Sequence, residues 1–203
     1  MRVAVIGLGV IGRVHARILR ENGSLGAVCD VDEAKLADYT DVARFTDYTR
    51  LLDDFRPDAV HICTPHHLHA EMVIAALERN IHVLCEKPLC ISHGEIDAIL
   101  RAEERSSAYL GVCLQNRYVN INRYVKDLIS NDKVIDGFGT MLWSRGKEYY
   151  DSAEWRGKWA TEGGGVVINQ ALHTLDLLQW FCGMPHSVNA STSNVNHEYI
   201  EVE

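Results

Sequence analysis

The chain has 203 residues, of which 47% are hydrophobic, and its formal net charge is −8 at pH 7. This length accommodates one large domain, or one domain and part of another, with enough apolar residues for a packed core. The acidic balance argues against nucleic acid or an anionic membrane surface as a partner.

Two further features of the composition concern the cellular compartment. No apolar run approaches the length that a membrane span requires, and no small-residue cleavage site follows the N-terminal apolar run. Six cysteines lie scattered, mostly in apolar runs, without a C-x-x-C pair or a zinc-like spacing. We therefore expect a soluble, cytoplasmic protein with buried free thiols.

The first twelve residues predict a strand, a tight turn and the start of a helix. Residues 3–6 form a short run rich in β-branched side chains that ends at Gly7, and from Val10 the apolar residues take a helical spacing. Gly7 allows the chain to leave the strand, and Gly12 allows the helix to pack closely on it.

The same turn offers a site for phosphate groups. Gly9 lets a pyrophosphate approach the backbone, and the helix start at Val10 and Ile11 presents N–H groups and a partial positive charge. A second apolar run, residues 25–29, ends at Asp30, where a carboxylate can hold a ribose 2′-hydroxyl. This context predicts dinucleotide binding; the alternative is a glycine-rich turn in another kind of α/β domain.

Asp30 also bears on the choice of cofactor. Its carboxylate would repel the 2′-phosphate of NADP, and no arginine or lysine follows it before Lys35. The sequence therefore favours NAD over NADP.

Helices and strands alternate as far as residue 117. Further helices are expected over residues 32–40, 47–55, 64–80 and 92–106, and further strands over residues 42–45, 59–63, 81–85 and 109–114. This alternation predicts right-handed parallel crossovers, with ligands bound at the carboxyl ends of the strands. The polar segments at these ends are the glycine turn, Asp30, Thr64-Pro65, Glu86-Lys87-Pro88 and Gln115-Asn116-Arg117.

The pattern changes after residue 117. The expected elements are a helix over residues 118–130, a strand over 139–147, a helical segment between the glycines at 163–165 and Gly183, and a polar strand near Val188. The aromatic, polar loop at residues 149–159 is either a platform for a sugar or part of the core or of a subunit interface.

Lys87 follows a buried strand at the edge where a nicotinamide ring would lie. A lysine there can hydrogen-bond a substrate hydroxyl, and partial burial would lower its pKa towards a useful range. Taken alone, a lysine after a strand is more often a solvated surface residue.

Asn169, His173 and Asp176 have the spacing i, i+4, i+7, which on a helix places them on one stripe. Apolar residues occupy the other faces, so the stripe is expected to face a cleft. His173 can act as a general base near neutral pH, and Asp176 can orient it. A purely structural role for His173, in polar contacts between domains, is the alternative.

Three histidines, His66, His67 and His69, lie together near a helix start. His66 and His67 point in different directions there, so contact with cofactor or substrate is favoured over a zinc site.

These motifs occur in an order that is similar to one known family. They are Gly7-x-Gly9-x-x-Gly12, Thr64-Pro65 with His69, Glu86-Lys87-Pro88, Asn116-Arg117, and Gly163-Gly164-Gly165 followed by Asn169-Gln170-x-x-His173-x-x-Asp176. Over essentially its whole length the chain resembles the Gfo/Idh/MocA oxidoreductases, the relatives of glucose-fructose oxidoreductase and inositol dehydrogenase.

The resemblance implies an α/β protein of two domains with the active site between them. Residues 1–117 would form a Rossmann domain with a doubly wound parallel sheet. Residues 118–203 would form part of an α+β substrate domain with an open, mostly antiparallel sheet. Family chains run well beyond 203 residues, so the chain is expected to be truncated in the second domain, with an unpaired sheet edge that favours instability or association. A complete sheet would support a homo-oligomer.

The resemblance also implies the roles of residues. The family's catalytic lysine and histidine fall on Lys87 and His173, and the Lys87–Pro88 peptide is expected to be cis. Many members have aspartate where this chain has Asn169, which can hydrogen-bond a hydroxyl but cannot take its proton. Members with Asn-Gln at this place look like a subgroup that acts on sugars or sugar derivatives.

We therefore expect an NAD-dependent dehydrogenase that transfers a hydride between a sugar or cyclitol hydroxyl and the nicotinamide. His173 would take the hydroxyl proton, Lys87 would polarise the same oxygen, and Asn169 and Asp176 would position substrate or histidine. No metal is expected. The residues expected to bind the cofactor are Gly7, Gly9, Val10, Ile11, Gly12, Asp30, Thr64, Pro65, His69, Glu86, Lys87, Asn116 and Arg117.

Two other functions stay open from the sequence. One is a truncated, non-catalytic NAD-binding protein that lacks a complete substrate pocket. The other is an NADPH-dependent reductase of a carbonyl or imine, which Asp30 argues against.

Overall fold

The computed structural model describes residues 1–129, 134, 136–195 and 197–202. The chain divides into two compact units, Met1–Cys113 and Leu114–Glu203. The sequence places the division after Arg117, whereas the structure groups residues 114–117 with the second unit.

The first unit is built on a six-stranded sheet in which every neighbouring pair is parallel. Its spatial order is β3-β2-β1-β4-β5-β6, which reverses direction between β1 and β4. This is the order of a doubly wound parallel sheet, so the predicted fold of this unit is confirmed. In such sheets, ligands bind at the point where the order reverses. The strands are β1 Val3–Ile6, β2 Leu25–Cys29, β3 Ala43–Phe45, β4 Ala59–Ile62, β5 His82–Cys85 and β6 Leu110–Val112.

The strands end level with one another. Ile6 pairs with Cys29 and with Ile62, Ile62 pairs with Cys85, and Cys85 pairs with Val112. The residue after each of four strands donates its N–H to a neighbouring strand at 2.8–2.9 Å; the donors are Gly7, Cys63, Glu86 and Cys113. The residues that follow the strands therefore share one edge of the sheet.

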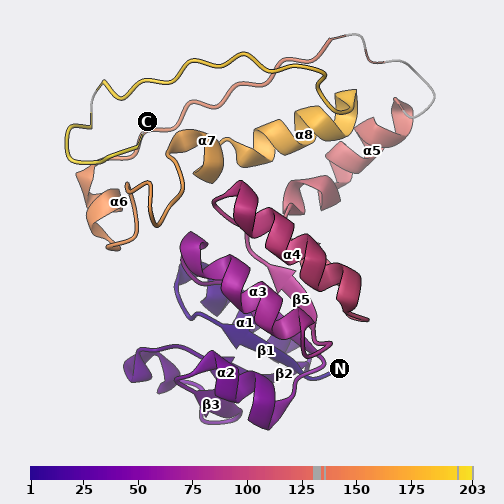
Figure 1. Ribbon diagram of the computed structural model, residues 1–203, viewed down its shortest axis with the longest axis vertical. Coiled ribbons are helices and arrows are strands. Elements are labelled where there is room, and N and C mark those ends of the chain that lie inside the picture. The colour runs from indigo at the N-terminus through magenta and orange to yellow at the C-terminus, as the bar shows by residue number, and fades with distance from the viewer. Residues whose placement is uncertain (130–133, 135, 196, 203) are drawn as a thin grey trace. The chain divides into compact units, whose positions relative to one another are not determined.

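Helices cover both faces of this sheet (Figure 1). On one face, α1 Val10–Glu21 and the 3-10 turn η1 Glu33–Leu36 contribute to a buried cluster with Val3, Val5 and Val28. The opposite face carries the larger cluster, which includes residues of η2 Leu51–Phe55, α3 His69–Leu77 and α4 His93–Arg105. Alternate side chains of each strand thus enter two separate cores.

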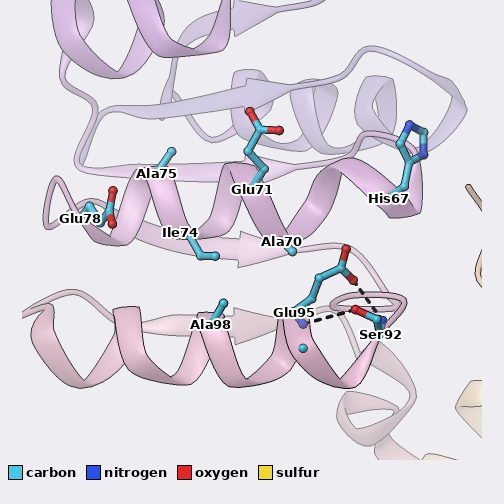
Figure 2. A pocket seen from close by; sticks show the side chains of 10 residues that line it. His67, Ala70, Glu71, Ile74, Ala75, Glu78, Ser92, Glu95 and Ala98 are labelled. Atoms are coloured by element: carbon cyan, nitrogen blue, oxygen red, sulfur yellow. Dashed lines mark hydrogen bonds between the residues drawn. The ribbon is translucent and has the colours of Figure 1, made fainter. Parts of the chain in front are cut away.

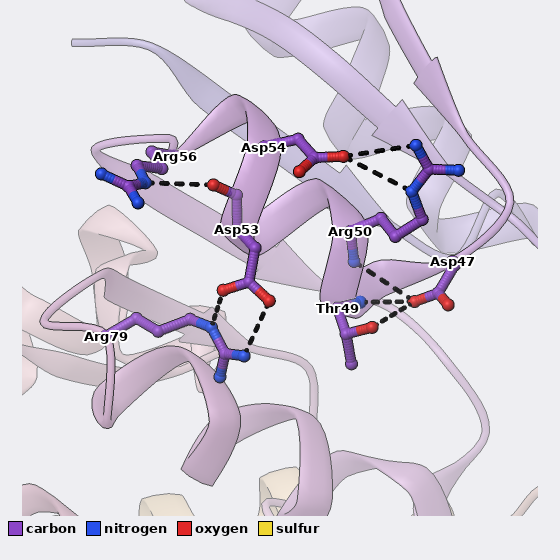
Figure 3. Close-up of polar contacts among 7 residues, drawn as sticks. All are labelled: Asp47, Thr49, Arg50, Asp53, Asp54, Arg56 and Arg79. Atoms are coloured by element: carbon purple, nitrogen blue, oxygen red, sulfur yellow. Dashed lines mark hydrogen bonds and ion pairs between the residues drawn. The ribbon is translucent and has the colours of Figure 1, made fainter.

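Polar residues set the start of the helix predicted at residues 47–55. Asp47 accepts the N–H groups of Thr49 at 2.7 Å and of Arg50 at 3.3 Å, which caps α2 Tyr48–Arg50 (Figure 3). The helix continues as the π-helical turn η2, where Asp53 pairs with Arg79 at 2.7 Å.

A capping box starts α4, since Ser92 and Glu95 each accept the other's backbone N–H. The 3-10 turn η3 His66–Leu68 leads into α3. The helix predicted over residues 32–40 is reduced to η1.

In the second unit, the regular secondary structure of the described residues is helical. The predicted helix at residues 118–130 is present over residues 120–128, and Ser130 lies outside the described residues. Among the residues that the structure describes, no helix is both long and apolar enough to cross a bilayer. The helical elements are η4 Gln115–Tyr118, α5 Asn120–Leu128, α6 Lys147–Asp151, α7 Val166–Asn169 and α8 Leu172–Cys182.

The two strands predicted for this unit are not formed in its described residues. None of its described residues belongs to a strand: residues 137–146 are extended chain, α6 begins at Lys147, and the chain near Val188 is likewise unpaired (Figure 1). An extended segment becomes a strand only when a neighbour pairs with its backbone groups, which alternation in the sequence cannot supply. The antiparallel sheet implied by the resemblance is therefore not seen in the described residues.

The helix predicted after the glycines at 163–165 is divided into two. α7 ends at Asn169, and Ala171 donates its N–H to Val166 at 2.8 Å in a wider turn before α8 begins. Asn169 therefore lies on a different helix from His173 and Asp176.

Candidate active site

The glycine turn after β1 is tightly packed on its inner side. Gly7 has φ +90°, and a Cβ there would lie 2.7 Å from the carbonyl oxygen of Cys63. A Cβ on Gly12 would lie 1.8 Å from the carbonyl oxygen of Gly7. Neither position accepts a side chain, as the sequence predicts.

The outer side of the turn is open. A Cβ on Gly9 would meet nothing within 4 Å, and Val10 is 89% exposed. Gly9 is also the N-cap of α1 and has no side chain to accept the first N–H groups. A cradle that is open, lined by backbone N–H groups and placed at the switch point of the sheet fits a pyrophosphate.

Asp30 holds this turn in place. Its carboxylate, 7% exposed, accepts the N–H of Leu8 at 2.7 Å and that of Asp32 at 3.0 Å. The Lys35 ammonium lies 3.2 Å from the same carboxylate. The acid predicted to bind the ribose thus holds the backbone of the glycine turn and pairs with Lys35, the first basic residue that follows it in the sequence.

Within residues 64–69, where cofactor contacts are predicted, His69 connects two segments of the backbone. The two ring nitrogens of His69 lie 2.7 Å from the carbonyl oxygen of Pro88 and 2.8 Å from that of Thr64. Burial lowers the pKa of His69, and the two carbonyl contacts act in the opposite direction. His69 thereby joins the end of β4 to the segment after β5, where the Lys87–Pro88 peptide is cis as predicted.

Glu86 is the centre of a polar network at the same edge. Its carboxylate lies 3.1 Å from Nε2 of His15, and the other ring nitrogen of His15 lies 3.0 Å from Nδ1 of His61. Burial alone would raise the pKa of Glu86, but hydrogen bonds from His15, Cys113 and the N–H of Lys87 outweigh it and lower the pKa. Glu86 is therefore a carboxylate next to the partly buried Lys87.

In the second unit, Arg117 holds Asp176. The guanidinium meets both carboxylate oxygens at 2.5–3.1 Å, and Asp176 is only 8% exposed. This hydrogen bond raises the pKa of Arg117. Arg117 and Asp176, predicted separately as cofactor and catalytic residues, are thus partners in one ion pair. Asn116 accepts a hydrogen bond from Asn122 at 2.8 Å through its carbonyl oxygen.

His173 lies on α8 next to Gln115. The side-chain nitrogen of Gln115 is 3.4 Å from Nε2 of His173. An amide nitrogen donates hydrogen bonds, and Nε2 accepts this one in the tautomer that carries its proton on Nδ1.

Asn169 takes part in a contact that the sequence analysis missed. Its amide nitrogen donates to Glu162 and, at 3.2 Å, to the hydroxyl of Tyr149. Glu162 is 1% exposed and also accepts the N–H of Gly157 at 2.5 Å. The only signal in the sequence was an acidic residue directly before three glycines, and the aromatic loop supplies Tyr149 as a structural partner.

A shallow groove lies on the first unit between α3 and α4, and of the three histidines predicted to contact cofactor or substrate, His67 lines it. Ala70 and Ile74 of α3 and Ala98 of α4 face the space between the helices, while Glu95 reaches back to Ser92 (Figure 2). This groove is separate from the edge of the sheet that carries the polar residues.

The sheet order and the open glycine turn define a dinucleotide-binding Rossmann domain. Residues 1–114 match the family model described as oxidoreductase family, NAD-binding Rossmann fold, and residues 125–203 match the GFO/IDH/MocA C-terminal domain. The chain belongs to the Gfo/Idh/MocA oxidoreductase family, and its first unit is an NAD-binding domain.

Relatives of known activity cover most of the chain. It is 27% identical to myo-inositol 2-dehydrogenase of Thermotoga maritima over 90% of its length, and 31% identical to 2,7-anhydro-N-acetylneuraminate hydratase of Mediterraneibacter gnavus over 96%. These matches cover 55% and 53% of the two relatives. The chain thus spans about half the length of the curated relatives it matches.

A solved structure is also similar. The WlbA dehydrogenase of Bordetella pertussis, in complex with NADH and UDP-GlcNAcA, matches with a TM-score of 0.89 and 31% identity. The match covers 100% of this chain and 64% of that one.

Proposed function

We propose that the protein is an NAD-dependent dehydrogenase that acts on a CH–OH group of a sugar or cyclitol. One observation carries the proposal: the open glycine turn, the clamped Asp30 and the Glu86-Lys87-cis-Pro88 segment lie along one edge of the sheet. Relatives that act on inositol, a sialic acid derivative and glucosides support the substrate class.

Bound NAD supplies a nicotinamide that exchanges a hydride with the carbinol carbon. The residues of the chain hold the cofactor and handle the hydroxyl proton. The backbone N–H groups at the start of α1 bind the phosphates, and Asp30 accepts from the ribose. His173 takes the hydroxyl proton as the general base, and Lys87 polarises the hydroxyl oxygen.

Asn169 and Asp176 act as positioning residues in this proposal. Their side chains are held by Glu162 and by Arg117, respectively, so both are fixed before a substrate binds. A rigid supporting network keeps a catalytic ring in productive geometry.

We also propose that the domain boundary falls after residue 117. The protein is proposed to be a cytoplasmic homo-oligomer. The match to the family's C-terminal domain supports an open antiparallel sheet in which the extended residues 137–146 would find strand partners, and such a sheet would supply the subunit interface.

The test is the absorbance of reduced nicotinamide with NAD and a panel of inositols, glucosides and nucleotide-linked sugars, beside a direct titration of NAD. Turnover on at least one polyol is expected. Binding of NAD without turnover on any of them would favour the non-catalytic alternative, and tighter binding of NADPH than of NADH would favour the carbonyl or imine reductase.

The Lys87→Met and His173→Asn variants test the proton-handling roles. Each is expected to lower kcat by about 10²–10⁴-fold, because a positioned acid or base contributes that much, while the affinity for NAD changes little. Lys147→Met and His186→Asn, two exposed positions outside the proposed site, are the matched controls. Near-normal turnover in a site variant would remove that residue from the mechanism.

A further inference from the structure

Three potential metal ligands converge on the first unit. A ring nitrogen of His15, a carboxylate oxygen of Glu86 and Sγ of Cys113 all lie within 4.8 Å of one another. The side chains of His15 and Glu86 are only 12% and 13% exposed, and their ligand atoms are 3.1 Å apart. The cluster is partly buried, unlike the exposed acidic groups that commonly gather on surfaces.

The backbone of the sheet brings these donors together. Glu86 follows β5 and Cys113 follows β6, and Cys113 donates its N–H to Cys85 at 2.8 Å, so the two residues lie level on neighbouring strands. His15 reaches the same point from α1, which packs on the sheet. The donors come from α1, from the residue after β5 and from the residue after β6, so one ion bound to all three would cross-link these segments.

The hydrogen bond on the far side of the His15 ring suits a metal ligand. Nδ1 of His15 lies 3.0 Å from Nδ1 of His61 on β4. A histidine that binds a metal through Nε2 carries its proton on Nδ1 and usually donates it to a fixed partner. In that tautomer the Nε2 lone pair and the Glu86 carboxylate face the same point, where a bound cation would take the place of the proton that joins them in the metal-free hydrogen bond.

The chemistry of the three donor atoms indicates which metal ion would bind. One nitrogen, one sulfur and one carboxylate oxygen suit zinc-class divalent ions, whereas magnesium and calcium prefer oxygen alone. Zinc bonds of about 2.0–2.3 Å place tetrahedral ligands about 3.3–3.6 Å apart, close to the observed separation of His15 and Glu86. The carboxylate and a thiolate together also balance the two positive charges, which a partly buried site requires.

We propose that His15, Glu86 and Cys113 form a three-ligand site for a zinc-class divalent metal ion, with His61 supporting the His15 ring. Three protein ligands leave a fourth position for water. The inference stands on the first unit alone and does not depend on the proposed dehydrogenase activity.

The experiment uses the metal-free full chain. Zinc is titrated in competition with a chromophoric chelator, and cobalt(II) is titrated while the sulfur-to-cobalt charge-transfer absorption is followed. We expect one equivalent of each ion to bind and the cobalt band to appear. Absence of this band from the unsubstituted protein overturns the proposal without recourse to any variant.

Variants then assign the ligands. Cys113→Ser is expected to abolish the cobalt–sulfur band, and His15→Asn to weaken zinc binding by more than 100-fold. His61→Phe is expected to weaken it by about 10–100-fold, as loss of a supporting hydrogen bond does. Cys90→Ser and His82→Asn are the matched controls and should bind as the parent does. An unchanged band in Cys113→Ser, in protein whose circular dichroism shows it folded, would place the metal elsewhere.

Discussion

Single residues at the edge of the sheet serve both the fold and the proposed chemistry. The Asp30 carboxylate must hold the N–H of Leu8 and also receive a ribose hydroxyl, and it does so beside the Lys35 ammonium. An ionised carboxylate has about four acceptor positions, and the N–H groups of Leu8 and Asp32 and the Lys35 ammonium meet it here, so a ribose hydroxyl would take a position that Lys35 now uses. The cation offsets part of the negative charge that would otherwise repel a 2′-phosphate.

Replacement of Lys35 should therefore sharpen the choice of cofactor. In Lys35→Met the Asp30 carboxylate loses its compensating charge, so the affinity for NADP should fall several-fold relative to that for NAD. Titrations of both cofactors, followed by protein fluorescence, measure the ratio of the two dissociation constants. Lys158→Met, which removes an exposed lysine, should leave this ratio unchanged. A ratio that shifts towards NADP would show that Lys35 does not act through Asp30.

The hydroxyl of Tyr48 should make the stability of the fold depend on pH at alkaline pH. Burial and the hydrogen bond to the carboxylate of Glu71 raise the pKa of Tyr48 to about 12. The folded state thus keeps this proton where an unfolded tyrosine, with a pKa near 10, releases it. The contribution of Tyr48 to stability is complete below pH 10 and is lost as the pH rises towards 12.

The absorbance of tyrosinate measures the pKa of Tyr48 directly. The difference between the parent titration and that of Tyr48→Phe should be one group that ionises near pH 12. Tyr109→Phe, at an 80% exposed position, is the control and should leave the group that ionises near pH 12 in place. A difference curve centred near pH 10 for Tyr48 would contradict the raised pKa.

At the scale of elements, the first unit was predictable because its strands are short apolar runs bounded by glycine, proline and acidic residues. The second unit was predicted less well. Its two expected strands depend on partners that lie far away in the chain or outside the described residues, and the break at Gln170 and Ala171 has no marker such as proline. Side-chain partners, such as Arg117 for Asp176, required the folded chain.

The glycine turn offers a matched pair of substitutions. In Gly12→Ala the new Cβ would lie 1.8 Å from the carbonyl oxygen of Gly7, so α1 must move away from β1, and we expect a loss of about 1–3 kcal/mol or more in stability. In Gly9→Ala the Cβ meets nothing within 4 Å, so the fold should be retained.

Thermal unfolding and NAD titration separate the two effects. Gly12→Ala should lower the Tm by several degrees, whereas Gly9→Ala should keep the Tm and bind NAD more weakly, because its methyl group stands where the pyrophosphate approaches. Unchanged NAD affinity in Gly9→Ala would mean that the phosphates do not bind at this turn.

At the scale of the whole molecule, each unit carries its own preorganised network. The first has Asp30, His69 and Glu86 tied to the ends of different strands. The second has Asp176 and Asn169 held by Arg117 and Glu162. The sequence named most of these residues because their motifs are local, but it could not show His15, Glu86 and Cys113 as one cluster, since they are far apart along the chain.

Because the strands end level with one another, the number of residues in each strand matters for the side chains at this edge. Side chains alternate between the two faces of a sheet, so the length of a strand decides on which side its terminal residue emerges. Loss of a single residue from the middle of β5 would turn Glu86 away from His15 and Cys113 while leaving every amino acid of that trio in the chain. Evolution can therefore vary the composition of these strands far more freely than their residue count.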